Sequence, residues 1–573
     1  MPSFTGARWA PLPVPPHHLE WLRTAHPKLS PIAARCLAIR WGDAPRRDGW
    51  LDPSLDHLHD PHAMTHMAAA VDRLRRAAGD KQRIRVVTDY DVDGTTSSLI
   101  LQAALKLTAP DLEVDYHIPD RFTEGYGFSV AAADAAADAG IQMIVTADIG
   151  VRDHRAVERA RERGVDVLIC DHHLPEGAAV PDGAIVLCPP QQACSYPNRA
   201  LAACGISLKV AQALLATHPK RDAVIRSMLK LAAIGTVADL VPLTTLENRA
   251  IVAMGLAELN RGPHGHGLQA LLAAAGLEGV DESDLGFRIG PRINAAGRVA
   301  DAKLVVRLLT SRDATEAAKL AAEIEHLNSQ RRGLQDRLVE RVLRELSVGT
   351  PDPFVVIAGP EAEGFHRGVV GIVAARVKET FHRPAAVVSI QGDRAVGSIR
   401  SVPGVHAVRA LDSARDLLEK YGGHPVAAGF TVPTDRIDEL RRRLGAFVEA
   451  EAAPDALDHV LEVDAFVDPN DLGDALLNEL SRLGPFGQGN PRPRLVLRGV
   501  RPAYVEARGK MLKVGIPRRA AASVEGIWWS PPIDPRALEA GPVDLYGDLS
   551  EHRWNGTRKL RFTITDARTA TEP

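Results

Sequence analysis

Strand-like and helix-like segments alternate along the chain from Arg83 onward, and this rhythm restricts it to few architectures. Apolar runs such as RIRVVTD, IQMIVTAD and VDVLICD are separated by segments whose apolar residues recur at helical spacing. Strands that alternate with helices form parallel sheets with helices on both faces. The rhythm therefore predicts a doubly wound α/β lobe over residues 81–300.

The rest of the chain adds further units, since its 573 residues correspond to three or four domains of about 150 residues each. Residues 1–80 have a mainly helical pattern, ending in MAAAVDRLRRAAG, and predict an N-terminal helical cap. Little except Gly333 interrupts the helical spacing from Thr315 to Leu346, which predicts a long connecting helix within residues 301–346.

A second, smaller α/β lobe is expected over residues 347–455. It begins with FVVIAG and the helix GVVGIVAARVKE, continues with the strand PAAVVSI and the hairpin-like RAVGSIRSV, and contains YGGHPVAAGF, which we expect to be a loop. After GPFGQGNPRP, short strands separated by turns predict a small β-barrel or sandwich within residues 456–573.

Composition and charge exclude several classes of protein. Hydrophobic residues make up 45% and charged residues 25%, which are values of a folded globular chain. No apolar run reaches a membrane-spanning length and the start lacks the apolar core of a signal peptide, so we expect no membrane association and a cytoplasmic location. The five cysteines form no CxxC pair and indicate neither a disulfide framework nor a thiolate zinc site. The net charge of −3 does not by itself indicate a nucleic-acid partner, so any anion site must be local.

Three alternating carboxylates, Asp89, Asp91 and Asp93, follow the first strand of the doubly wound lobe. The carboxyl ends of parallel strands line the ligand crevice of such a sheet, so we expect these side chains to meet there. Three carboxylates so close together repel one another, and a divalent cation with a preference for oxygen ligands, Mg²⁺ or Mn²⁺, removes that cost. Ordinary helix capping at an Asp-Gly turn is the alternative, and this motif alone does not decide between the two.

The next two strand ends carry further ligand types. Asp148 follows IVTA, and Asp171, His172 and His173 follow VLIC, so carboxylates and imidazoles converge from three strands. Asp239 in AIGTVADLVPL could complete the set, or could only cap a helix. For the two histidines the alternative is a structural pair hydrogen-bonded to backbone. Together these groups are sufficient for a two-metal site that hydrolyses a phosphate ester.

In this order, DYDVDGTTS, TADIG, DHH and GTVADLVPL resemble the motifs of the DHH phosphoesterase superfamily. IPDRFTEGYG, RINAAGR, GSIRSVPG, GGHPVAAGF and GPFGQGNPRP resemble, within it, the bacterial RecJ family of single-strand-specific DNA exonucleases. The resemblance covers roughly residues 50–570. Ile149 and the segment CPPQQ depart from the expected pattern, but neither contains a proposed ligand.

The resemblance implies roles for individual residues. His173 would lie beside the scissile phosphate, and Asp89 and Asp171 would orient the ligands. The residues implied to bind the two Mg²⁺ or Mn²⁺ ions are Asp91, Asp93, Asp148, His172 and Asp239.

Phosphate-binding groups are expected in the second lobe. Ser398 and Arg400 in GSIRS can offer a hydroxyl and a bidentate guanidinium from one strand, although the alternative is an exposed strand face. Gly422, Gly423 and His424 permit close backbone approach to an anion, or form a plain glycine turn.

Three further residues depend on the resemblance. It places Arg121 and Arg298 around the 5′ end and the entering strand, whereas lone arginines are usually solvated. His366, before Gly368, would face the cleft or cap the following helix.

The C-terminal strands combine aromatic and basic residues, which is how single strands are bound without sequence preference. We expect most of these aromatics to be core residues, and the resemblance is to a fold of the OB type. The residues concerned are Trp528, Trp529, Tyr546, Trp554 and Phe562, with Arg508, Lys510, Lys513, Arg553 and Lys559.

The resemblance implies a metal-dependent 5′→3′ exonuclease of single-stranded DNA that acts in DNA repair and recombination, with a single-strand DNA-binding protein and a RecQ-type helicase as partners. One alternative is a phosphodiesterase of short oligonucleotides, cyclic dinucleotides or polyphosphate, and another is a replication scaffold without activity. The C-terminal strands favour a polymeric substrate over the first alternative, and the complete ligand set argues against the second.

Overall fold

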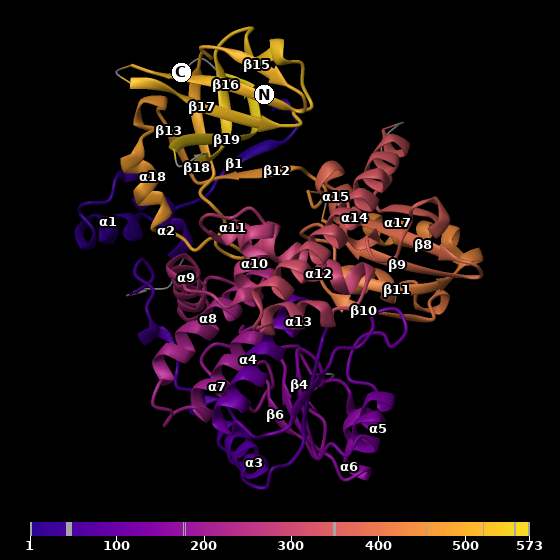
Figure 1. Cartoon of the computed structure of the whole chain (residues 1–573). Coiled ribbons are helices and arrows are strands. Elements are labelled where there is room, and N and C mark those ends of the chain that lie inside the picture. Colours follow the sequence, from indigo (N-terminus) through magenta and orange to yellow (C-terminus); the bar gives the residue numbers. More distant parts are fainter. Residues whose placement is uncertain are drawn as a thin grey trace. The chain divides into compact units, whose positions relative to one another are not determined.

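The computed structural model describes residues 3–41, 49–175, 177, 179–347, 351–453, 455–519, 521–554 and 557–570. They form two compact units (Figure 1). The first unit consists of Met1–Thr5, Ala10–Glu325 and Glu462–Pro573, and the second consists of Gly6–Trp9 and His326–Leu461.

A five-stranded parallel sheet is the centre of the first unit, with the strand order β3-β2-β4-β5-β6. All residues of β4 are buried, as expected for a strand covered on both faces. Because chain order reverses between β2 and β4, their carboxyl ends flank the switch point at which such sheets bind ligands. The strands are β2 (Ile84–Thr88), β3 (Val114–His117), β4 (Met143–Ala147), β5 (Asp166–Cys170) and β6 (Ile185–Leu187).

Helices cover both faces of this sheet, which confirms the doubly wound lobe (Figure 1). Val86 of β2 packs into one core cluster with α3, α4 and α7, whereas its neighbour Val87 packs into another cluster with α5 and α6. These helices are α3 (Met67–Gly79), α4 (Val92–Thr108), α5 (Val130–Asp138), α6 (His154–Glu162) and α7 (Ala203–Leu214).

A helical segment follows the sheet in the same unit. Its first helix, α8, packs against α4 and α9, so that the end of α8 reaches the region near the start of α4. The segment comprises α8 (Arg221–Ala238), α9 (Leu246–Arg261), α10 (His266–Ala274), α11 (Glu282–Asp284), the π-helical turn Leu285–Ile289, α12 (Gly290–Val299) and α13 (Lys303–Thr310).

The predicted long helix is present as α14 (Ala314–Leu346). The division between the two units falls inside this helix, between Glu325 and His326. Gly333, which we expected to weaken the helix, lies within it.

A five-stranded sheet with the order β10-β11-β9-β8-β7 is the centre of the second unit. Only β7 and β8 pair in parallel, and β8 and β9 form the expected hairpin. The elements are β7 (Val355–Pro360), α15 (Val370–Phe381), β8 (Ala385–Gln391), β9 (Arg394–Arg400), α16 (Ala407–Asp412), β10 (Lys420–His424), β11 (Ala427–Pro433) and α17 (Ile437–Glu451).

The expectation of a loop at YGGHPVAAGF is wrong, because β10 and β11 form an antiparallel hairpin there. Gly423 has φ +148°, and a Cβ on it would lie 2.4 Å from the carbonyl oxygen of Ala427. Gly423, one of the glycines that suggested a loop, is therefore needed for close pairing at the edge of the sheet.

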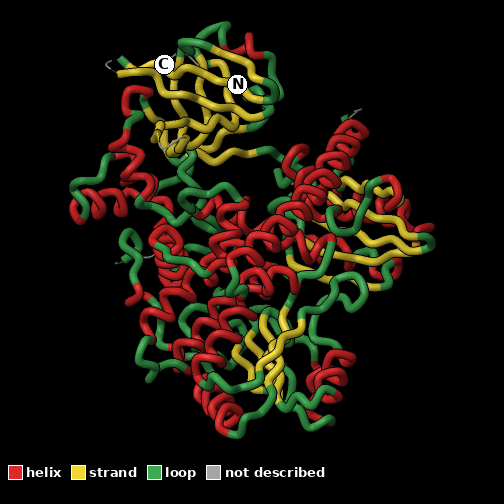
Figure 2. The backbone as a smooth tube through the Cα atoms, in the orientation of Figure 1, coloured by secondary structure: helices red, strands yellow, loops and turns green. Residues whose placement is uncertain are grey.

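The C-terminal residues form a seven-stranded sheet with the order β13-β14-β18-β19-β17-β16-β15, as the turn-separated strands predicted. Figure 2 shows the strands of this sheet in yellow, joined by green loops. The elements are β13 (Ala465–Val467), α18 (Asp474–Ser481), β14 (Leu495–Val500), β15 (Val505–Arg508), β16 (Met511–Arg518), β17 (Ala521–Trp529), β18 (Val543–Trp554) and β19 (Thr557–Thr569).

Both ends of the chain contribute to one core in the first unit. Leu37, Trp41 and Trp50 are buried in the same cluster as Val467 of β13 and Leu545 of β18. The N-terminal elements are β1 (Arg8–Pro11), which pairs with β12 (Val460–Val463), α1 (Pro16–Ala25) and α2 (Pro31–Trp41). Within the described parts of the chain, no helix is both long and apolar enough to cross a bilayer.

Candidate metal centre

The carboxyl end of β2 places the three predicted carboxylates at the switch point of the sheet. Asp89 comes directly after the strand, and Asp91 caps α4, accepting a hydrogen bond on Oδ1 from the Gly94 nitrogen at 3.0 Å. Helix capping, the alternative weighed for this motif, is thus one function of Asp91. A Cβ on Gly94 would lie 2.3 Å from the Asp89 carbonyl oxygen, so this tight strand-to-helix turn requires glycine.

Asp93, in the first turn of α4, is only 1% exposed and is held by the start of α7. Its two carboxylate oxygens accept hydrogen bonds from the backbone nitrogens of Ala203 at 2.7 Å and Cys204 at 2.8 Å. These donors belong to a helix N-terminus, which favours negative charge. Sequence reasoning missed both of them, because a backbone donor has no residue signature.

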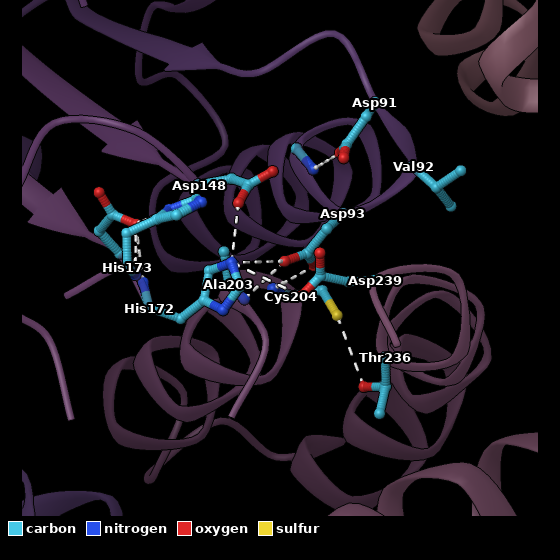
Figure 3. Close-up of polar contacts among 12 residues, drawn as sticks. Asp91, Val92, Asp93, Asp148, His172, His173, Ala203, Cys204, Thr236 and Asp239 are labelled. Carbon is cyan, nitrogen blue, oxygen red and sulfur yellow. Dashed lines mark hydrogen bonds and ion pairs between the residues drawn. The ribbon is translucent and has the colours of Figure 1, made fainter. Parts of the chain in front are cut away.

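His172 connects three of the carboxylates (Figure 3). Its Nε2 lies 3.1 Å from Asp148, 3.6 Å from Asp239 and 4.0 Å from Asp93, each distance measured to a carboxylate oxygen. Asp148 follows β4 with φ +65°, a conformation that aspartate tolerates better than most residues. Asp239 comes directly after the last residue of α8.

Asp171 fixes the orientation of His173. Its Oδ1 lies 2.8 Å from Nδ1 of His173, and its Oδ2 accepts a hydrogen bond from the Val151 nitrogen at 3.0 Å. The other ring nitrogen, Nε2, lies 3.3 Å from the hydroxyl of Tyr126, which also lies 3.3 Å from the Asp148 carbonyl oxygen. Tyr126 was missed as a single residue, although IPDRFTEGYG contains it, because a tyrosine between two glycines has no ligand signature.

The charges of this cluster are not balanced by the protein. Burial, followed by repulsion from neighbouring carboxylates, raises the pKa of Asp89, Asp148 and Asp239 well above the usual range. The buried Oδ1 of Asp89 has no hydrogen-bond partner among the described residues. Burial lowers the pKa of His172, which favours the neutral imidazole that binds metals.

The pKa shifts of Asp171 and His173 are opposite to those of the three carboxylates above and of His172. Burial alone would raise the pKa of Asp171, but its hydrogen bond to His173 and the charges of both histidines lower it to about 2. Burial opposes protonation of His173, but the hydrogen bond with Asp171 outweighs it and raises the pKa of His173. The two residues form an ion pair beside the carboxylate cluster.

Three overlapping groups have ligand atoms within 4.8 Å of one another: Asp89, Asp91 and Asp148; Asp93, His172 and Asp239; and Asp148, His172 and His173. Asp148 and His172 each occur in two of these groups, so each could contribute to holding two neighbouring ions. Carboxylate oxygens with one or two imidazoles suit Mg²⁺ or Mn²⁺. The residues present therefore fit a pair of such ions.

Arg121 and Arg298, which we predicted to lie near the entering strand of DNA, are both close to Tyr90, two residues after β2. The guanidinium carbon of Arg121 lies 5.1 Å from the centre of the Tyr90 ring. Burial, and then the charge of Asp89, raise the pKa of Tyr90 to about 12, while the charges of Arg121 and Arg298 oppose this rise. Both arginines therefore lie near Tyr90, a residue of the segment that carries the carboxylates.

In the second unit, Ser398 and Arg400 lie together on β9, with Arg400 Nη1 2.9 Å from Ser398 Oγ. A Cβ on Gly371, in the first turn of α15, would lie 2.9 Å from Ser398 Oγ and 3.1 Å from Arg400 Nη2. The pair therefore lies against the start of a helix, where backbone N–H groups favour anions. His366 lies in the turn before α15, where its Nδ1 accepts a hydrogen bond from the Gly368 nitrogen.

The glycine-histidine segment lies in the same sheet as this pair. Gly422 occupies the same register row as Ser398, with Gly429 of β11 between them. His424 is likewise in the row of Arg400, with Ala427 between them. Gly423 is the position of the β10–β11 hairpin at which a side chain would be strained. The structure thus brings the eight predicted carboxylates and histidines around β2, β4, β5 and α8 together in one unit, and places the predicted phosphate-binding residues of the second lobe in the other.

The C-terminal aromatics divide by exposure. Trp528, Tyr546 and Phe562 are buried core residues, as expected for most of the set, whereas Trp529 is 61% exposed. Trp529 pairs with Met511, beside the turn Arg508–Lys510, so aromatic and basic groups adjoin there. Lys513 is paired with Glu525 at 2.8 Å and Lys559 is exposed, and the side chains of Arg553 and Trp554 lie outside the described parts of the chain.

The sequence matches three protein families in the expected order. It matches the DHH family N-terminal domain over residues 83–236, the DHHA1 domain over residues 352–450 and the RecJ OB domain over residues 463–566. These matches cover the parallel sheet, the second unit and the C-terminal sheet.

Two similar proteins are single-stranded-DNA-specific exonucleases RecJ. That of Bacillus subtilis is 35% identical over 521 residues, which are 89% of this chain, and the chain spans 64% of its length. That of Thermus thermophilus is 35% identical over 572 residues, with 98% of this chain and 78% of the relative covered.

Solved structures give the same result. The crystal structure of Thermus thermophilus RecJ in complex with Mn²⁺ superposes with a TM-score of 0.82 at 30% identity, covering 99% of this chain and 80% of that one. The crystal structure of the same protein in complex with Mg²⁺ superposes with a TM-score of 0.75 at 29% identity, covering 99% and 79%.

Proposed function

Because the chain belongs to the RecJ family of single-stranded-DNA-specific exonucleases, we propose that its carboxylate and histidine cluster hydrolyses the first phosphodiester bond at the 5′ end of single-stranded DNA. The observation that carries this proposal is the convergence of five carboxylates and two histidines at the switch point of the parallel sheet, in three overlapping groups whose ligand atoms lie within 4.8 Å of one another. The enzyme depends on Mg²⁺ or Mn²⁺ and takes part in DNA repair.

Asp91, Asp93, Asp148, His172 and Asp239 would hold two ions. When bound, the ions supply an activated water and neutralise charge on the phosphate. Asp93 is kept in place by the start of α7, and Asp148 and His172 fix each other through their 3.1 Å contact. Asp89 orients the cluster from the end of β2.

His173 has a separate role in this proposal. Asp171 holds its Nδ1, so Nε2 is the atom that faces the substrate side, next to the Tyr126 hydroxyl. The raised pKa of His173 favours the protonated ring, which can donate a hydrogen bond from Nε2 to a phosphate oxygen or to the leaving oxygen.

The 5′→3′ direction depends on phosphate-binding groups. Ser398, Arg400 and His424, with the N-terminus of α15 next to the first two, can bind the terminal phosphate through charge-assisted hydrogen bonds. Arg121 and Arg298 would neutralise phosphates of the entering strand near Asp89. The exposed Trp529 with its basic neighbours supports a stacking contact for longer strands.

Digestion of end-labelled DNA tests the proposed function. Single strands labelled at the 5′ end should lose the label first as a mononucleotide in Mg²⁺ or Mn²⁺, and strands labelled at the 3′ end should shorten progressively. Blunt duplexes should persist, and a chelator should stop the reaction. Release of the 3′ label first, or equal digestion of duplexes, would contradict the proposal.

The proposal also includes partners and location. A single-strand DNA-binding protein and a RecQ-type helicase would supply and present the single strand, which co-purification with each protein can test. A DNA repair enzyme of this kind would act in the cytoplasm. The clustering of these carboxylates and histidines supports an active enzyme over the alternative of a scaffold without activity.

A further inference from the structure

Several large apolar side chains are exposed in the segments around the carboxylate cluster, Leu240 and Phe287 among them. Leu240, the residue after Asp239, is 67% exposed, and Phe287 is 81% exposed, the highest value among the large hydrophobic residues that the structure describes. Single exposed apolar residues are common on protein surfaces. These two are informative because of the segments that carry them.

Leu240 has a backbone conformation that favours glycine. Its φ is +57°, one position after the Asp239 cap of α8, where a left-handed residue is most often glycine. A leucine in this conformation is strained, and its exposed side chain gains little from burial to offset that strain. Stability of the fold therefore does not explain why a large apolar side chain projects from this position.

Phe287 lies in a π-helical turn that packs against the same end of α8. A Cβ on Gly286 would lie 3.7 Å from Val237, and one on Gly290 would lie 3.7 Å from Ala238 and 3.9 Å from Val92. The turn therefore touches the residues before Asp239 and the residue between Asp91 and Asp93. Turns of this kind are frequently found at functional sites.

We infer that Leu240 and Phe287 form a contact surface for the nucleobase of the nucleotide that is removed. This inference rests on the proposed function and names which part of the substrate the surface binds. The carboxylate cluster and the arginines account for the phosphates, but each nucleotide also brings an apolar base whose faces are exposed in a single strand. An aromatic and an aliphatic side chain suit that base, and stacking of this kind is independent of base identity. Leu240 directly follows Asp239, and the turn that carries Phe287 packs against α8, so both residues belong to segments that adjoin the metal centre.

Abasic substrates test the inference directly. The rate of release of the first nucleotide, as kcat/KM, is compared between a 5′-phosphorylated single strand with an intact terminal nucleotide and the same strand with a tetrahydrofuran at that position. For the wild type, loss of the base should lower kcat/KM about fivefold or more. Leu240→Gly and Phe287→Ala should lose a comparable factor on the intact strand and should distinguish the two strands much less.

A matched control separates the side chain from the backbone. Lys81 is another exposed residue with positive φ, at +51°, and lies before β2, at the end of the strand away from the carboxylates. Lys81→Gly should leave the preference for the intact strand unchanged. Leu240→Gly should be at least as heat-stable as the wild type, because it removes backbone strain.

The outcomes distinguish this inference from the proposed function. If the variants release nucleotides but keep the base preference of the wild type, these side chains do not contact the base and the inference is wrong. If the wild type itself shows no metal-dependent release, the proposed function fails, and the inference fails with it.

Discussion

Burial, and then the charges of Asp91 and Asp93, raise the pKa of the Asp148 carboxyl well above its usual range. The folded protein without metal therefore binds this proton more tightly than the unfolded chain does. Stability from this group is lost as the pH rises above the carboxyl's usual pKa, because the carboxylate must then be buried among like charges. Bound cations reverse the sign of this effect, since they favour the ionised form.

We therefore expect Asp148→Asn to have opposite effects with and without metal. In a chelator it should raise the melting temperature relative to the wild type, more at pH 8 than at pH 5. In saturating Mn²⁺ the variant should bind metal more weakly than the wild type. Its kcat should fall by more than about a hundredfold, because changes to residues that only support a metal ligand already cost about 10- to 100-fold. Thermal unfolding at the two pH values and single-strand digestion measure these effects. A lower melting temperature of the variant in chelator at pH 8 would contradict the account.

Arg400 is the residue at which recognition of the 5′ phosphate can be tested. Arg400→Ala should lower kcat/KM on 5′-phosphorylated strands more than on 5′-hydroxyl strands, by about 1.5 to 3 kcal/mol for a charge-assisted contact. Arg394→Ala is the matched control, since Arg394 begins the same strand and pairs with Glu419 at 3.2 Å. An equal loss of kcat/KM on both substrates would show that Arg400 supports the fold and does not bind the 5′ phosphate.

Sequence reasoning at this scale could find side chains but not their partners. Asp148 and His172 were predicted because carboxylates and imidazoles at the ends of parallel strands must converge. The Ala203 and Cys204 nitrogens that hold Asp93 were not predicted, because any residue can supply a backbone donor. The hydroxyl contact of Tyr126 depends on a loop conformation that its neighbours in sequence do not specify.

At the scale of elements, the start of α15 positions the pair Ser398 and Arg400. Gly371→Ala should displace both side chains, because its Cβ would lie within 3.1 Å of each. We expect the free energy of unfolding to change by less than about 1 kcal/mol, since alanine also favours the helix, while the preference for 5′-phosphorylated strands falls. Chemical denaturation and digestion of the two substrates measure this.

The control for this change is Gly445→Ala in α17, where a Cβ would have no atom within 4 Å. Gly445→Ala should stabilise the protein slightly and leave the substrate preference intact. The account of α15 would be wrong if Gly371→Ala and Gly445→Ala left the same preference for 5′-phosphorylated strands.

The elements themselves were mostly predictable. The 3.6-residue spacing found α14, and the strand-helix rhythm found the parallel sheet, because both patterns report burial directly. The β10–β11 hairpin was missed, since glycines that are required by close pairing have the same letters as glycines that end a strand. Periodicity also could not predict that the π-helical turn packs against α8.

At the scale of the whole chain, the C-terminal sheet shares a core with the N-terminal helices. The guanidinium of Arg249 in α9 also donates hydrogen bonds to the carbonyl oxygens of Trp50 and Gly484. A variant truncated after Ala456 would lack the C-terminal sheet and would expose this core. Such a variant therefore cannot show whether the C-terminal sheet binds DNA, because its folding would be affected as well. The shared core was not predictable, because it depends on apolar residues more than 400 positions apart, such as Leu37 and Val467.

A point variant separates the two properties. Trp529→Ala should weaken binding of long single strands by about 1 to 3 kcal/mol, the value of one stacked base, without affecting stability. A strand too short to reach the C-terminal sheet should be cut at the wild-type rate. Fluorescence anisotropy with strands of increasing length measures the affinity, and an unchanged affinity for long strands would show that Trp529 does not contact DNA.

The measurement that tests the central claim most directly is anomalous diffraction from crystals grown with Mn²⁺. The account predicts two anomalous peaks about 3.5 to 4 Å apart. Their ligands should come from Asp91, Asp93, Asp148, His172 and Asp239, and one or more of these should bridge the ions. Protein that digests single strands in Mn²⁺ but shows its peaks elsewhere, or none at these residues, would contradict the assignment of this cluster as the catalytic metal centre.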